Sequence, residues 1–143
     1  MKKLMVMIMV MVMAAASVFA HPLDDKAREM AAANKPAIEF NLKQHEALRA
    51  EYNSVLEQYP EFTKWEHYDT VVETITFVDS VIAFDKQEIS ILDDIIENGY
   101  SAFESHQDEI ESLQKREAEL QKKQIKLQKK VDKLLKQIEK LNK

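Results

Sequence analysis

The side chains of this sequence that can do chemistry are its histidines and its many carboxylates. The four histidines are His21, His45, His67 and His106. No two of them have the spacing of a metal-binding motif such as HExxH, and His106 lies beside acidic neighbours that can simply satisfy it. If a leader is removed before His21, its imidazole and free amine could bind a transition metal loosely. The pattern predicts no dedicated metal site.

Nucleophilic and phosphate-binding chemistry is also missing from the sequence. A single glycine cannot build a GxGxxG turn, a P-loop or a nucleophile elbow. No cysteine is available for a thiolate or a disulfide. The carboxylates form an acidic face with no distinct catalytic pair. We therefore expect a protein that is not an enzyme, with no catalytic residue and no cofactor.

The elements that carry these side chains are set by a heptad register that spans residues 68–141. Of its 22 core positions, 17 are apolar. The five exceptions are Asp85, Gly99, His106, Glu117 and Gln124. A stripe of this length indicates a coiled coil, with isoleucine prominent in one row and leucine in the other. The leucines predicted to drive self-association are Leu113, Leu120, Leu127, Leu134 and Leu141.

Charge leaves two ways to pair the C-terminal end. Residues 21–114 carry 7 basic and 21 acidic side chains, and residues 115–143 carry 11 basic and 4 acidic. Basic residues flank one side of the leucine row and glutamines the other, so the tail suits a parallel twin or an antiparallel acidic helix such as residues 61–98. Both charge runs could instead be solvated faces of a rod.

The scarcity of glycine and proline predicts an all-α fold, an elongated helical hairpin or coiled coil with a long C-terminal helix. A short helix capped by Asp24 or Asp25 precedes a second helix that starts at Pro36 and runs to about Tyr59. Pro60 breaks the pattern. A second apolar row over residues 71–96 requires partners on two sides, as in a three- or four-helix bundle.

Three segments follow from these signals. Residues 1–20 have the charged start, apolar run and small residues of a secretory signal peptide, with an uncleaved anchor as the alternative. Residues 21–60 form an N-terminal helical segment. Residues 61–143 form one long coiled-coil helix that starts near Glu61, with Thr63 as a candidate cap. A break at 98–100 is the weak point, because Gly99 suits a helix end, and a second hairpin there is the alternative.

Two surface features are candidates for contact with partners. The aromatic residues Phe62, Trp65 and Tyr68 lie close to the Pro60 break, where they either staple the turn or form a recognition tip. The lysines near the C-terminus have no interleaved aromatic residues, so we expect no nucleic-acid binding. They could make peripheral contact with an anionic membrane surface.

The stretch Ala47, Leu48, Arg49, Ala50, Glu51 and Tyr52 resembles the FadA-type bacterial adhesins. The resemblance extends to the cysteine-free chain, the signal peptide and the helical C-terminus. It implies a helical hairpin that self-assembles through leucine-lined faces and attaches to receptors on host cells. The lysine-rich C-terminal zipper and the isoleucine-rich residues 75–96 depart from that family's pattern.

These observations predict an exported, self-associating surface adhesin at the cell surface or outer membrane, with itself and a host cell-surface protein as partners. The alternative is a periplasmic helical chaperone or spacer of the OmpH/Skp kind. Such proteins also need a small β-rich body, and residues 21–60 show no alternating strand pattern.

Overall fold

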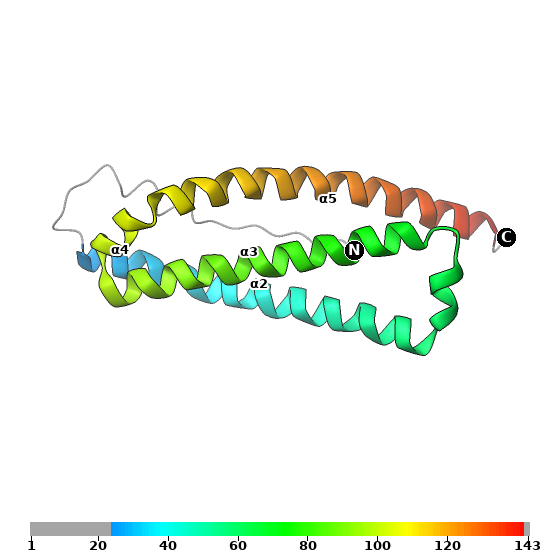
Figure 1. Ribbon diagram of the computed structural model, residues 1–143, viewed down its shortest axis with the longest axis horizontal. Helices are drawn as coiled ribbons and strands as arrows, with labels where there is room; N and C mark the ends of the chain where they lie inside the picture. The colour runs from blue at the N-terminus through cyan, green and yellow to red at the C-terminus, as the bar shows by residue number, and fades with distance from the viewer. Residues whose placement is uncertain (1–23, 142–143) are drawn as a thin grey trace.

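The computed structural model describes residues 24–141, whose backbone forms three long α-helices joined by short helical turns (Figure 1). Helices α2 (Asp24–Gln58) and α3 (Tyr68–Asn98) are joined by the 3₁₀ helix η2 (Pro60–Lys64). Helix α4 (Tyr100–Ser105) joins α3 to α5 (Gln107–Leu141). No strand occurs in these residues, which confirms the all-α fold class. The predicted signal peptide and His21 lie outside them.

Helix α3 runs between the other two long helices and antiparallel to both (Figure 1). On one side, Lys35 pairs with Asp93 and Arg49 with Asp79. The beginning of α2 therefore lies beside the end of α3, as in an antiparallel pair. On the other side, Lys130 of α5 pairs with Glu73 at the far end of α3 from the α3–α4 turn. The chain is thus an elongated three-helix bundle, and the antiparallel pairing of the basic tail with the acidic 61–98 segment occurs within one molecule.

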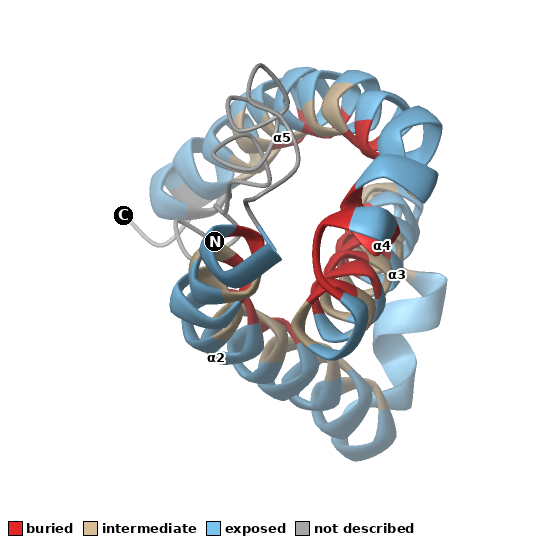
Figure 2. Ribbon diagram, turned by 90° about the vertical axis from the view of Figure 1, so that its left-hand side faces the viewer, coloured by how far each residue is buried: buried red, intermediate tan, exposed pale blue. Residues whose placement is uncertain are grey.

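The core occupies the inner sides of the three helices (Figure 2). Its members from α3 come from both apolar rows, because this helix is covered on two sides. They are Phe77, Val78, Val81, Phe84, Ile91, Leu92 and Ile95. The bundle expected from the wide apolar arc is therefore the observed architecture.

The N-terminal segment differs from the prediction at Pro36. We expected a break there, but α2 is one helix with Pro36 inside it. A proline in a helix leaves the carbonyl four residues earlier, here that of Ala32, without its N–H donor. Both Pro36 and Ala32 are exposed, so water can take the place of that donor.

The break expected at Pro60 is present, but the next helix begins later than predicted. It starts at Tyr68 instead of near Glu61. Thr63 does not cap it, because its hydroxyl donates to the Pro60 carbonyl inside η2, with Oγ1 and O separated by 2.8 Å. The side chain therefore stabilises the turn rather than the helix start.

The expectation of one helix over residues 61–143 is wrong. Helix α3 stops at Asn98, and Gly99 has φ +72° and ψ −146°, a conformation that only glycine adopts easily. A second bend follows at His106, where α4 ends. We call residues 99–106 the joint. The hairpin at Gly99, the alternative reading of the sequence, is the arrangement present.

The fold-back also changes the role of the leucine row. Leu113, Leu120 and Leu127 are buried inside the single chain, and Leu134 is half-buried. The side chain of Leu141 is not among those described. The seam predicted to bind a second molecule is occupied by the chain's own α3. Self-association through it therefore requires α5 to leave its place.

Replacing Leu120 with alanine should lower the free energy of unfolding by about 2–4 kcal/mol, because the change leaves a cavity in the α3–α5 seam. Chemical denaturation followed by circular dichroism measures this loss. Ile125→Ala is the matched control, since Ile125 lies on the same helix and is 57% exposed. Equal midpoints for the two variants would contradict the observed burial of the seam.

Candidate functional site

An aromatic cluster covers the turn between α2 and α3 at one end of the bundle. Edge-to-face contacts connect its rings in a row: Tyr59 to Phe62 at 6.1 Å, Phe62 to Trp65 at 6.2 Å, and Trp65 to His67 at 5.1 Å between centroids. This geometry is the favourable one for aromatic pairs. We call Tyr59, Phe62, Trp65 and His67 the aromatic tip.

The aromatic tip contains two of the three contact residues predicted from the sequence. Phe62 and Trp65 belong to the row of rings, whereas Tyr68 is the half-buried first residue of α3. Tyr59 is half exposed, at 50%, and Phe62 is 37% exposed, so the rings pack on one another without being covered. His67 was not predicted, because only its contact with Trp65 identifies it.

Trp65 also faces the C-terminal part of α5. A shallow apolar pocket of about 160 Å³ lies between α2, the turn, α3 and α5. Its lining includes Tyr52, Trp65, Val71, Val131 and Leu134. Leu134, a half-buried member of the leucine seam, is therefore part of the wall behind the tip.

A second side-chain cluster crosses the centre of the bundle. It contains His45 of α2, Asp85 and Glu88 of α3, and Glu117 of α5, and we call it the polar layer. Nδ1 of His45 lies 2.6 Å from Oδ2 of Asp85, and both residues are buried. Glu88 is fully buried, and neither of its carboxylate oxygens has a hydrogen-bond partner.

Burial controls the protonation of this layer. It raises the pKa of Glu88 to about 8, and the charges of Asp85 and Glu117 add to the shift. Burial also raises the pKa of Glu117 and, against the opposing hydrogen bond with His45, that of Asp85. Glu88 is therefore mostly a neutral acid at pH 7. The heptad register predicted Asp85 and Glu117 as polar core positions, but the burial of Glu88 follows from α5 folding onto α3.

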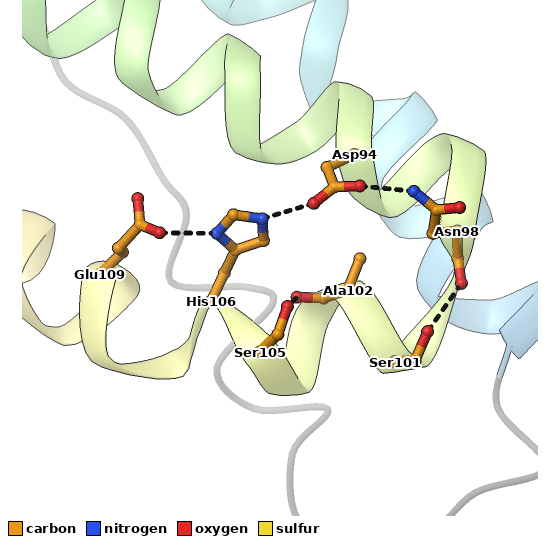
Figure 3. Close-up of polar contacts among 7 residues, drawn as sticks. All are labelled: Asp94, Asn98, Ser101, Ala102, Ser105, His106 and Glu109. Carbon is orange, nitrogen blue, oxygen red and sulfur yellow. Dashed lines mark hydrogen bonds and ion pairs between the residues drawn. The ribbon is translucent and has the colours of Figure 1, made fainter.

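The joint holds a second ionisable cluster (Figure 3). The two ring nitrogens of His106 lie 2.6 Å from Asp94 of α3 and 2.9 Å from Glu109 of α5. Asn98 donates to the other oxygen of Asp94. Partial burial alone would lower the pKa of His106, but its two carboxylate partners outweigh this effect and raise it. A protonated His106 therefore links the helices on both sides of the joint.

The lysines of α5 border a groove beside the seam. This hollow of about 350 Å³ lies between α3 and α5, and its wall combines apolar residues with three lysines. The lysines are Lys123, Lys126 and Lys130. Lys130 is paired with Glu73 across the groove, so part of the basic run serves the α3–α5 contact.

Neither metal binding nor membrane crossing has support in residues 24–141. No group of three or more His, Asp or Glu side chains there is arranged to hold a metal ion. No helix in the same part of the chain is long and apolar enough to cross a membrane.

A comparison of the chain with protein-family models, curated proteins and solved structures finds no match. The resemblance to FadA-type adhesins therefore depends on residues 47–52 and the general architecture alone. Any function must be argued from the surfaces described above.

Replacing Glu88 with glutamine should stabilise the bundle above pH 5 and flatten its pH dependence. The unfolded carboxyl titrates near 4.5 and the folded one near 8. The folded state thus holds a proton that the unfolded state releases, and stability falls as pH rises through this window. Across this window the free energy of unfolding of the unmodified chain falls by at most about 5 kcal/mol.

Thermal unfolding at several pH values between 4.5 and 9 tests this prediction, with exposed Glu97→Gln as the control for a lost surface charge. If the stability of the Glu88 variant still falls with pH above 6.5, we attribute that remaining pH dependence to His106. Its raised pKa gives stability that is complete below 6.5 and is lost as pH rises further. Identical pH curves for the Glu88 variant and the unmodified protein would contradict the prediction.

Proposed function

We propose that this protein is an exported adhesin that attaches to a host cell-surface protein through the aromatic tip. The observation that supports this most directly is the row of partly exposed rings at one end of a rigid hairpin. Aromatic side chains supply most of the binding energy at many protein interfaces, because they bury a large area with little loss of conformational freedom. A turn at the end of a long bundle can reach a partner without obstruction from the rest of the molecule.

The tip is also prepared for binding before a partner arrives. Its rings support each other edge to edge, and the Thr63 hydroxyl fixes the turn through the Pro60 carbonyl. A preformed surface loses less entropy when it binds than a mobile loop does. Phe40 on α2 is also exposed, but it does not belong to the row of rings in the tip. We assign it no role in binding.

The alternative of a chaperone of the OmpH/Skp kind receives less support. That reading requires a small β-rich body near the N-terminal end, and residues 24–60 are helical apart from Tyr59. The groove beside α5 could hold an extended client, but Lys130 and Glu73 already bridge it. The adhesin proposal explains the tip, which the chaperone proposal leaves without a use.

Replacing Tyr59 and Phe62 together with alanine should reduce binding of the purified protein to cultured epithelial cells by about 30-fold, the effect of removing an interface hot spot. Fluorescent protein and flow cytometry give the affinity. Phe40→Ala removes a 62% exposed phenylalanine outside the tip and should bind as the unmodified protein does. Equal binding by all three proteins, or none by the unmodified one, would overturn the proposal.

Protease treatment of intact cells should degrade the protein, because an adhesin must be exposed at the surface. Immunoblotting before and after treatment measures the loss, and a cytoplasmic protein in the same cells serves as the lysis control. Complete protection on intact cells, followed by degradation once the outer membrane is opened, would instead place the protein in the periplasm.

A further inference from the structure

The contacts between α3 and α5 can form equally well when the two helices come from two different chains. Its apolar part is the seam, in which Leu113, Leu120 and Leu127 are buried. Its outer part contains the pair of Lys130 and Glu73, with Nζ 2.9 and 3.0 Å from the two carboxylate oxygens. Neither set of contacts requires the two helices to belong to the same molecule.

The joint is the covalent connection between α3 and α5 of one chain, and it is short. It contains the positive-φ Gly99, the six-residue helix α4 and the bend at His106. The burial of Tyr100 and Phe103 in the core and two groups of polar contacts hold it closed. The Tyr100 N–H donates to Oδ1 of Asp24 over 2.9 Å, and His106 bridges Asp94 and Glu109.

The heptad register passes through the joint without a slip. Gly99, Phe103 and His106 occupy core positions of the same register that places Leu92 before the joint and Leu113 after it. If the joint straightened into a helix, α3 and α5 would form one rod with a single continuous apolar stripe. The α5 half of that rod would then need another α3 to cover it.

We propose that two copies of this chain exchange α5, so that α5 of each packs antiparallel on α3 of the other through the contacts now made within one chain. This inference rests on the self-association expected of the proposed adhesin, and it supplies a route that keeps the seam buried. Exchange of an identical element is a low-cost way to form a dimer, since it reuses an existing interface.

Charge favours α3 of the second copy over its α5 in antiparallel contact. Helix α3 carries 8 acidic side chains and one basic side chain, whereas the flank of α5 beside the seam presents Arg116, Lys123 and Lys130. Two α5 helices in antiparallel contact would set lysine against lysine. An α5 on the partner's α3 restores the pairing of Lys130 with Glu73 in both halves of the dimer.

The absence of native cysteine makes the exchange directly testable. Glu73→Cys and Lys130→Cys variants are co-refolded at high concentration and treated with a short bismaleimide. Exchange predicts a covalent dimer in the mixture and none in either variant alone. In the exchanged dimer the two copies of position 73 are roughly 85 Å apart at 1.5 Å per helical residue, as are those of position 130.

Each result of this cross-linking has a distinct meaning. Dimers formed by Lys130→Cys alone would indicate a parallel zipper, which overturns the exchange but leaves self-association intact. Monomers at every concentration would overturn the exchange and the self-association together. Neither outcome concerns the aromatic tip, whose binding to cells is measured separately.

A second variant tests the joint itself. A Cβ at Gly99 would lie 3.0 Å from Oδ1 of Asp24, and its positive φ is unfavourable for alanine. Gly99→Ala should therefore disfavour the closed joint by about tenfold per chain and favour the straight helix. Light scattering across a concentration series should show more dimer than the unmodified protein forms. An unchanged or smaller dimer fraction in a folded Gly99→Ala protein would contradict the proposal.

Discussion

The wide apolar arc of α3 is the constraint on which the rest of the molecule depends. Its buried side chains come from two neighbouring rows, so a single partner helix would leave one row in water. Helix α2 covers one side through the turn at Pro60. The other side requires a helix with a narrow apolar stripe, and the α5 of the same chain can supply it only if the chain reverses at Gly99. The two turns, the tip and the seam follow from this need.

The sequence predicted what depends on local chemistry and on periodicity. The all-α class, the break before Pro60 and the need for two partners of α3 could all be read from residue spacing. The direction of the chain after Gly99 could not, because a heptad register is the same whether a helix continues or folds back. The chain just after Gly99 is held by a distant contact, the bond from Tyr100 to Asp24, which no local pattern contains.

The same reasoning explains which parts of the candidate site were missed. Phe62 and Trp65 were recognised because aromatic residues beside a proline turn are conspicuous in a sequence. The polar layer was recognised only in part. Asp85 and Glu117 break the heptad pattern, but Glu88 lies outside the register and becomes buried only when α5 brings Glu117 over it. The burial of a charged residue between two helices can be predicted only when the pairing of those helices is known.

Because the contacts within one chain and between exchanged chains are the same, the balance between the two forms depends on the joint and on concentration. A short connection gives α5 an effective concentration in the millimolar range at its own α3, which favours the closed monomer. Opening removes the bond to Asp24 and the link between His106 and Asp94, but it also relieves the bends at Gly99 and His106. Each difference of 1.4 kcal/mol changes the equilibrium about tenfold, so small changes at the joint have large effects. If the protein acts as the proposed adhesin, crowding of many copies on a surface would raise their local concentration and favour exchange there.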